Sequence, residues 1–197
     1  MEMTSSKENF TPEFRSTFQT SIDQDGFLIC QEDLECRELD DIAVIVLRTS
    51  KDHKKNIEVV NECFGVNLPE ALCINSGNNN IKCLWISPDE FWLVDNRQNK
   101  AGILDKIELL SEGMSMIDNS AAYGVLEFTG KKMYSLLARW MSYDLGGSLS
   151  SKKVVSTTLG QAPVIVFRDA EDKLLMLVRH SFSHYVAGLL KDSAKRI

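Results

Sequence analysis

Short apolar runs alternate with amphipathic stretches along most of this chain. The β-branched run at 42–47 predicts a strand, and residues 52–64, with apolar side chains at helical spacing, predict a helix. Residues 82–86 and 91–94 flank a Ser-Pro-Asp-Glu turn and predict a β-hairpin. The apolar positions of 102–110 fall on one face of a further helix. The order is therefore strand, helix, hairpin, helix.

The same order of elements recurs in the second part of the chain. The pattern predicts a strand at 123–128, a helix at 130–141, a hairpin of 163–167 with 174–178, and a helix at 181–195 with Ser181 as its N-cap. A Gly- and Ser-rich crossing with one extended piece lies between, at 143–159. Corresponding positions keep a nearly constant separation: Val44 and Val125, for example, are 81 positions apart. The sequence thus predicts an α+β fold built from pseudo-duplicated β-α-β-β-α units.

The N-terminal segment 1–23 is polar and differs from the rest. Its apolar anchors, Phe10, Phe14 and Phe18, recur every four residues. Two readings stay open: the rings form a helical stripe laid against another surface, or the segment is a frayed tail. The remaining residues, 24–197, are expected to form one domain with halves at about 40–112 and 113–197.

Composition limits the classes of function. The chain has 197 residues, is 44% hydrophobic and carries a formal charge of −6, so it can bury a sizeable core but lacks the clustered cations of a nucleic-acid binder. No apolar run approaches the roughly 18 to 20 residues of a membrane span. The N-terminus has neither the basic nor the apolar part of a secretory signal. We expect a cytoplasmic protein without nucleic-acid or membrane partners.

Candidate chemistry is sparse. The five cysteines show no C-x-x-C spacing and are expected to be mostly buried thiols, although a Cys-His pair stays open. His53 is expected on the surface. His180 and His184 have the i, i+4 spacing of helical metal ligands, but neither a neighbouring Glu nor a third ligand accompanies them. Phosphate-binding glycine loops and nucleophile elbows do not occur. We therefore predict no catalytic, cofactor or metal site in this chain.

Large aromatic and Arg side chains are the candidates for a subunit interface, since these types are enriched where proteins dock. The candidates are Trp85, Trp92, Arg139, Trp140, Arg179, Phe182 and Tyr185. For each residue taken singly, packing inside the protein is the alternative.

Several segments resemble one known family. Residues 84–94 (LWISPDEFWLV) are similar to a hairpin of the gamma subunits of heterotetrameric sarcosine oxidase, and 117–126 with the following Gly130 are similar to the next segment of those proteins. Shorter matches continue the series at 136–138, 144–145, 162–165 and 178–185. The resemblance covers roughly residues 81–195. Arg139 and Trp140 replace the family's usual Gly-Cys, and His180 replaces an Arg.

The resemblance implies the folate-binding fold of glycine-cleavage aminomethyltransferases and a place beside alpha, beta and delta subunits. Such a complex oxidises sarcosine to glycine, passes the methyl group to tetrahydrofolate or releases it as formaldehyde, and reduces oxygen to hydrogen peroxide. Its FAD, FMN, NAD and zinc, and its use of tetrahydrofolate, are expected on the other chains. In the aminomethyltransferases an acidic residue before the first hairpin helps to hold folate. Asn78, Asn79 and Asn80 stand there in this chain, so folate binding is not expected.

Two other functions compete with an accessory subunit of sarcosine oxidase. The shared fold permits a stand-alone folate-dependent aminomethyl or one-carbon transferase, because fold alone does not determine function. A subunit of a related N-methyl amino acid dehydrogenase is the second, and the residues do not separate its substrate from sarcosine.

Overall fold

The first of two antiparallel sheets is built mainly from the first half of the chain. The computed structural model describes residues 15–49, 53–110 and 112–197. The order of strands in this sheet is β4 (Ile74–Ser76), β5 (Lys82–Ser87), β6 (Glu90–Asn96), β3 (Ile42–Arg48) and β7 (Ser115–Asp118). The predicted hairpin is confirmed as β5 and β6, which pair Trp85 with Phe91.

Helices α1 (His53–Phe64) and α2 (Lys100–Leu104) cover the outer face of this sheet. The 3₁₀ helices of this lobe are η1 (Asn78–Asn80), η2 (Arg97–Asn99) and η3 (Asp105–Leu109). Val60 and Phe64 of α1 and Ile103 of α2 pack on the strands in one apolar cluster. The single helix predicted at 102–110 is wrong in detail, because α2 gives way to η3 after Leu104. Tightening into 3₁₀ geometry is common where a helix ends.

The second sheet comes mainly from the second half. Its order is β1 (Phe27–Gln31), β2 (Leu34–Leu39), β8 (Tyr123–Thr129), β11 (Lys173–Arg179), β10 (Ala162–Ala170) and β9 (Val154–Leu159). Its helices are α3 (Met133–Leu137), α4 (Leu145–Ser148), the 3₁₀ helices η4 (Ser120–Ala122) and η5 (His180–Phe182), and α5 (Ser183–Ala194). α5 buries Val186, Ala187 and Leu190 in the core of this lobe.

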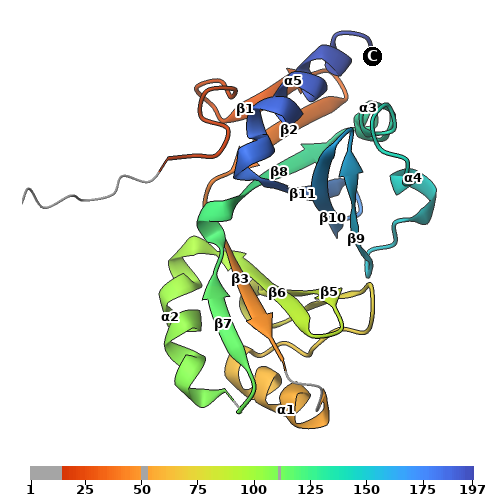
Figure 1. Cartoon of the computed structure of the whole chain (residues 1–197). Coiled ribbons are helices and arrows are strands. Elements are labelled where there is room, and N and C mark those ends of the chain that lie inside the picture. The colour runs from red at the N-terminus through yellow and green to blue at the C-terminus, as the bar shows by residue number, and fades with distance from the viewer. Residues whose placement is uncertain (1–14, 50–52, 111) are drawn as a thin grey trace, which may run out of the picture.

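The two lobes repeat one plan, which confirms the predicted duplication. β3, β5 and β6 of the first sheet correspond in order and pairing to β8, β10 and β11 of the second. Each sheet also takes a strand from beyond its own half: β7 pairs with β3, and β2 pairs with β8. Figure 1 shows the chain crossing between the lobes from β2 to β3 and again from β7 to β8.

Two predictions for helices of the second lobe are wrong. The helix expected at 130–141 contains only α3, and Met141 still reaches the core through a looser turn. Ser181 is not an N-cap, because the turn η5 precedes α5 and Phe182 stands at the cap position without a side-chain hydrogen bond. In both places short turns join the helix to the neighbouring strands.

The described part of the N-terminal segment is anchored on the second lobe. Phe18 is fully buried in that core, and its backbone N–H donates to the Glu38 carboxylate. The Ser16 hydroxyl donates to the same carboxylate. Phe18 packs against another surface, as one of the two readings expected. It lies in a run of turns, however, so the helix expected by that reading is not formed there. Phe10 and Phe14 lie outside the described residues.

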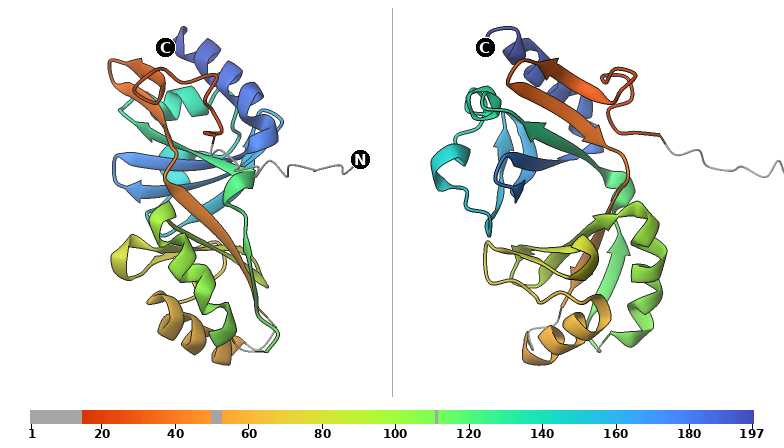
Figure 2. Two further views of the ribbon diagram at one scale, coloured as in Figure 1. Left: turned by 90° about the vertical axis from the view of Figure 1, so that its left-hand side faces the viewer. Right: turned by 180° about the vertical axis from the view of Figure 1, so that it is seen from behind.

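An apolar layer joins the lobes. Val44, Trp92 and Val94 of the first sheet meet Phe167 and Leu177 of the second in one buried cluster. The views in Figure 2 show the two sheets facing each other, with α1 and α5 at opposite ends of the molecule. Among the described residues, no helix is long and apolar enough to cross a membrane.

Candidate functional site

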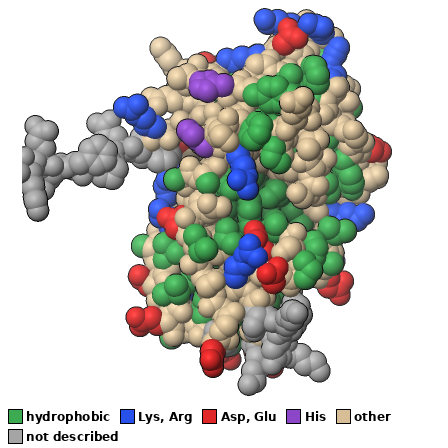
Figure 3. Space-filling view, in the orientation of Figure 1, with side chains coloured by type: hydrophobic (Ala, Val, Ile, Leu, Met, Phe, Trp, Pro, Cys, Tyr) green, Lys and Arg blue, Asp and Glu red, His purple; other side chains and the backbone are tan. Residues whose placement is uncertain are grey.

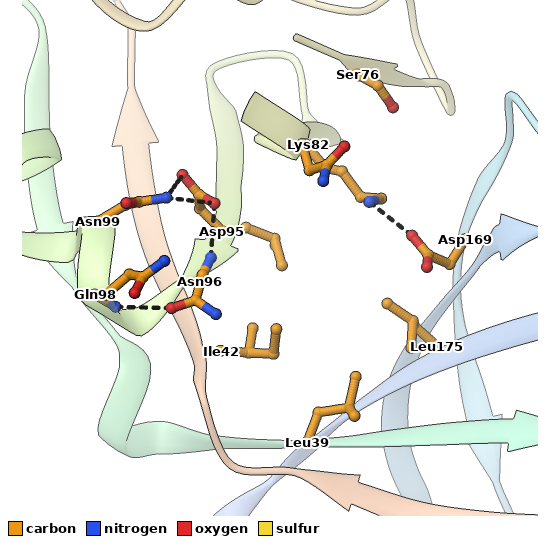
Figure 4. Close-up of a pocket in the computed structure, with 12 residues that line it drawn as sticks. Leu39, Ile42, Ser76, Lys82, Asp95, Asn96, Gln98, Asn99, Asp169 and Leu175 are labelled. Carbon is orange, nitrogen blue, oxygen red and sulfur yellow. Dashed lines mark hydrogen bonds and ion pairs between the residues drawn. The ribbon is translucent and has the colours of Figure 1, made fainter. Parts of the chain in front are cut away.

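A cleft of about 590 Å³ opens between the lobes beside this apolar layer. Its floor is apolar, formed by Leu39, Ile42, Val94 and Leu175. Polar side chains form the rim, and Figure 4 shows them in two groups, with Asp95 and its amide neighbours on one side and Lys82 with Asp169 on the other. A cleft with an apolar floor and a few polar groups is the usual form of a small-molecule site.

Asp95 is the acidic group at the end of β6, and it is only 9% exposed. Its carboxylate accepts hydrogen bonds from the backbone N–H of Asn96 at 2.7 Å and from the side-chain amide of Asn99 at 3.1 and 3.2 Å. The side chain of Asn96 accepts the N–H of Gln98 at 3.0 Å and so caps η2. Buried carboxylates need such partners. These bonds hold the rim together internally.

The opposite side of the cleft is closed by an ion pair. The ammonium of Lys82 on β5 lies 2.6 Å from the carboxylate of Asp169 on β10. Both side chains are partly buried, and each belongs to a different sheet. The pair therefore connects the lobes.

Three of the five thiols, those of Cys36, Cys63 and Cys83, do not have the properties of nucleophiles. Burial raises the pKa of the Cys36 and Cys83 thiols well above the ordinary value, and burial is also the largest cause of the raised pKa of Cys63, against the opposing charge of Lys106. A reactive cysteine needs a lowered pKa, because the thiolate is the attacking species. These three thiols are accordingly held protonated.

His180 and His184 belong to no metal-ligand cluster in the described part of the chain. His180 lies on η5 and His184 on α5, both exposed, and His53 begins α1. Within residues 15–49, 53–110 and 112–197, no three His, Cys, Asp or Glu side chains come together as metal ligands would.

Of the aromatic residues considered for an interface, Trp92 is a core residue. It is 4% exposed, its ring meets Tyr123 edge to face at 4.8 Å, and its indole N–H donates to Glu90 at 2.7 Å. The expectation that Trp92 faces a partner is wrong for this chain as folded, because the second lobe already covers it.

Trp85, Phe182 and Arg179, three other candidates for an interface, are neither as buried as Trp92 nor grouped on one surface. Trp85 and Phe182 are half-buried against the cores of their lobes. Arg179 is exposed, with its guanidinium 5.6 Å from the centre of the Tyr123 ring. Burial raises the pKa of Tyr123, and the Arg179 charge opposes that rise.

The structure brings Arg139, Trp140 and Tyr185 together on the outer side of the second lobe. Trp140 is 42% exposed and Tyr185 39%, and Arg139 is exposed. The indole N–H of Trp140 donates to the Ser193 hydroxyl at 2.7 Å, so the ring is held on α5. Sequence spacing did not indicate this grouping, since Trp140 and Tyr185 are far apart along the chain.

Comparison with known proteins identifies the family. A sequence model described as the sarcosine oxidase, gamma subunit family matches residues 51–196. The chain belongs to the sarcosine oxidase gamma subunit family. The resemblance seen at 81–195 is thereby confirmed, and the family match reaches further toward the N-terminus.

Two curated relatives carry the family's name. The chain is 29% identical over 133 residues to sarcosine oxidase subunit gamma of Corynebacterium sp. strain U-96, and 27% identical over 134 residues to that of strain P-1. These matches cover 66% and 67% of this chain. They span 64% and 66% of the relatives, just under two thirds of their length.

Solved structures share this architecture. A chain of the heterotetrameric sarcosine oxidase from Corynebacterium sp. U-96 in complex with pyrrole 2-carboxylate superposes with a TM-score of 0.80 at 24% identity, over 93% of this chain and 95% of that one. The glycine cleavage system aminomethyltransferase T from Bartonella henselae gives 0.61 at 13% identity, over 81% and 46%. The predicted aminomethyltransferase-like α+β fold is confirmed.

Proposed function

We propose that this chain is an accessory subunit of a heterotetrameric sarcosine oxidase and contributes no catalytic residue of its own. The observation that carries the proposal is the family match across residues 51–196. The agreement of fold with a chain of a heterotetrameric enzyme supports it. The chain's task in this proposal is to bind the alpha, beta and delta subunits and stabilise them. The complex oxidises sarcosine to glycine, with hydrogen peroxide and formaldehyde or methylenetetrahydrofolate as products.

The chemistry of the described side chains supports the accessory role. The raised pKa of three thiols disfavours nucleophilic catalysis at these positions. Asp95 already accepts three hydrogen bonds within its own lobe, which leaves less of its carboxylate available to a ligand's donor. In this proposal FAD, FMN, NAD, zinc and tetrahydrofolate bind to the other subunits.

A stand-alone folate-dependent transferase is the competing function, and the cleft does not favour it. Asn80 lines the cleft, in the neighbourhood where the aminomethyltransferases were expected to place an acid, and the Lys82–Asp169 pair closes the opposite side. Titration of the isolated chain with tetrahydrofolate, followed by Trp fluorescence, separates the two functions. We expect no saturable change. Saturable binding would support the transferase.

Copurification tests the accessory role directly. The tagged chain is produced together with the alpha, beta and delta subunits from the same genome. We expect all four chains in constant proportion, with activity on sarcosine. A chain that stays alone while the others assemble would contradict the proposal. Comparing sarcosine with other N-methyl amino acids on the purified complex tests the substrate.

Two further parts of the proposal need their own measurements. Adding the isolated chain to a complex that lacks it should raise the stability of the complex without adding a new cofactor. A cofactor that appears only with this chain would contradict the accessory role. The cytoplasmic location stays a prediction, which fractionation of cells producing the tagged chain would test.

A further inference from the structure

The outer face of α5 has a composition unlike the rest of the surface. The helix buries one side, with Val186 and Leu190 in the core, and presents Tyr185, Gly188 and Asp192 on the other. Trp140 adds to this outer side through its hydrogen bond to Ser193. We call the surface formed by Arg139, Trp140, Tyr185, Gly188 and Arg196 the α5 face.

Both aromatic rings of the α5 face are held in place while partly exposed. The carbonyl of Trp140 accepts the Gly160 N–H at 2.8 Å, and its indole N–H donates to Ser193 at 2.7 Å. The Tyr185 hydroxyl accepts the backbone N–H of Gln161 at 3.2 Å. Immobilised aromatic side chains lose little conformational entropy on docking. Anchored, half-exposed aromatic rings are therefore suited to a protein interface.

Gly188 lies on the same exposed side of α5. A Cβ added there would meet nothing within 4 Å in this chain, so internal packing does not require a glycine. Glycine inside a helix is less stable than alanine by roughly 0.5–1 kcal/mol. At Gly188, between Tyr185 and Asp192, the helix backbone carries no side chain, which allows another chain to approach closely. The position of Gly188 is thus understandable if a partner packs on this helix.

The charge of this region is opposite to that of the whole chain. Arg139, Lys195 and Arg196 are the exposed cations of this region and Asp192 is its acid, while Lys191 of the same helix donates to the backbone carbonyl of Ser21. The chain as a whole carries −6. Figure 3 shows Lys and Arg side chains gathered over the C-terminal end of α5. Opposite charges across an interface steer association and determine which partner fits. The complementary surface is an acidic one.

A hollow of about 310 Å³ lies at the end of the helix, where a partner's side chain could enter. It is lined by Arg139, Trp140, Asp192, Ser193 and Arg196. The guanidinium of Arg196 pairs with Asp192 at 2.8 Å. Arg139 on the other wall offers a second guanidinium, and guanidinium groups bind carboxylates through two parallel hydrogen bonds.

We infer that the α5 face docks on an acidic surface of a partner subunit, with an Asp or Glu side chain of that subunit in the hollow beside Trp140 and Arg139. This inference rests on the proposed function, because it names the surface by which the accessory subunit binds. It assigns no role to the cleft between the lobes. The partner is defined by its chemistry: carboxylates around an apolar centre, with backbone close to Gly188.

Charge reversal at Arg139 tests the inference in the complete complex. Arg139→Glu should lower the share of this chain that copurifies with the other subunits by about tenfold, and it should weaken the dependence of assembly on salt. Lys152→Glu makes the same change of charge at an exposed site away from α5, and it should assemble like the wild type. Equal recovery of Arg139→Glu and Lys152→Glu would overturn the inference.

Gly188→Ala separates docking from folding. The alanine should raise the melting temperature of the isolated chain, since it favours the helix, yet lower the copurified share. A more stable variant that assembles as well as the wild type would count against close approach at Gly188 and overturn that part of the inference.

The outcomes distinguish this inference from the proposed function. If the wild-type chain does not copurify with the other subunits, the proposed function fails. If the wild type copurifies and Arg139→Glu does so equally, only the docking surface is wrong. Sedimentation of the isolated chain should show a monomer. A dimer that Arg139→Glu dissociates would overturn the inference in favour of a second copy of this chain.

Discussion

Two groups of Trp, Tyr and Arg side chains in this protein have similar compositions and opposite environments. Trp92, Tyr123 and Arg179 lie where the lobes meet, and Trp92 is almost completely covered. Trp140, Tyr185 and Arg139 lie on the outer side of the second lobe and remain partly exposed. The same residue types thus pack between the two lobes in the first group. In the second group they stay exposed, where we propose that a partner chain binds.

The largest effect is expected from truncating the covered tryptophan. Trp92→Ala should lower the free energy of unfolding by about 3–5 kcal/mol, because it leaves a cavity between the sheets and removes the contact with Tyr123. Urea unfolding followed by Trp fluorescence and by far-UV circular dichroism measures this change. For the wild type we also expect the two probes to coincide, as the predicted single domain at 24–197 requires. A loss below about 1 kcal/mol would place Trp92 with the exposed group.

The matching truncation on the outer side should act on assembly. Trp140→Ala should reduce copurification with the other subunits by about tenfold, as loss of an interface anchor does. The isolated chain should lose only about 1 kcal/mol of stability, mainly the hydrogen bond to Ser193. If the two tryptophan variants were equally destabilised and assembled equally well, the contrast between the groups would be wrong.

The two ion pairs near these groups offer a smaller comparison. Removing the partly buried pair across the cleft with Lys82→Ala should cost about 1 kcal/mol, since it connects the lobes. The Arg196–Asp192 pair on α5 is well exposed, so Arg196→Ala should change stability by less than about 0.5 kcal/mol. A double-mutant cycle with Asp169→Ala measures the coupling of the inter-lobe pair. A coupling energy of zero would mean that Lys82 and Asp169 do not join the lobes.

The smallest effect concerns alkaline pH. Burial raises the pKa of folded Tyr123 above the ordinary value of 10.0 that it regains on unfolding. Between these two values the folded protein holds a proton that the unfolded chain has lost. This contribution to stability is therefore complete below pH 10 and is lost as pH rises through the folded pKa. Tyr123→Phe keeps the ring on Trp92 and should flatten the fall in stability above pH 10. An unchanged slope would show that Tyr123 is accessible to water.

Local patterns in the sequence determined much of this protein. The alternation of apolar runs predicted β3, both hairpins and α1, because a strand buried on both faces reads as a β-branched run and a half-buried helix reads as a 3.6-residue period. Equal spacing of these elements predicted the duplication. The ordered motifs from residue 84 to residue 185 pointed to the family, because a match of motifs along the chain requires no knowledge of tertiary contacts.

Other elements depended on partners distant in the chain. β1 is an apolar run only five residues long. β7 is four residues long and buries only Met116, and charged residues interrupt β2, so neither of these two strands shows a strong apolar run. These strands exist because β3 and β8 offer edges to pair with. β2 does alternate, with Leu34 and Cys36 buried between exposed neighbours, and that alternation was the available signal.

Tertiary structure alone decided which of the candidate interface residues are exposed. The sequence named seven aromatic and Arg residues as interface candidates, but only the packing of one lobe on the other shows that Trp92 is used internally. It also brings Trp140 to Ser193 and to Gly160, and Tyr185 to the adjacent Gln161, although these residues are distant in sequence. Burial is a property of the whole fold, because it depends on which other residues cover a side chain. The type of a side chain determines only the free energy of exposing it to water.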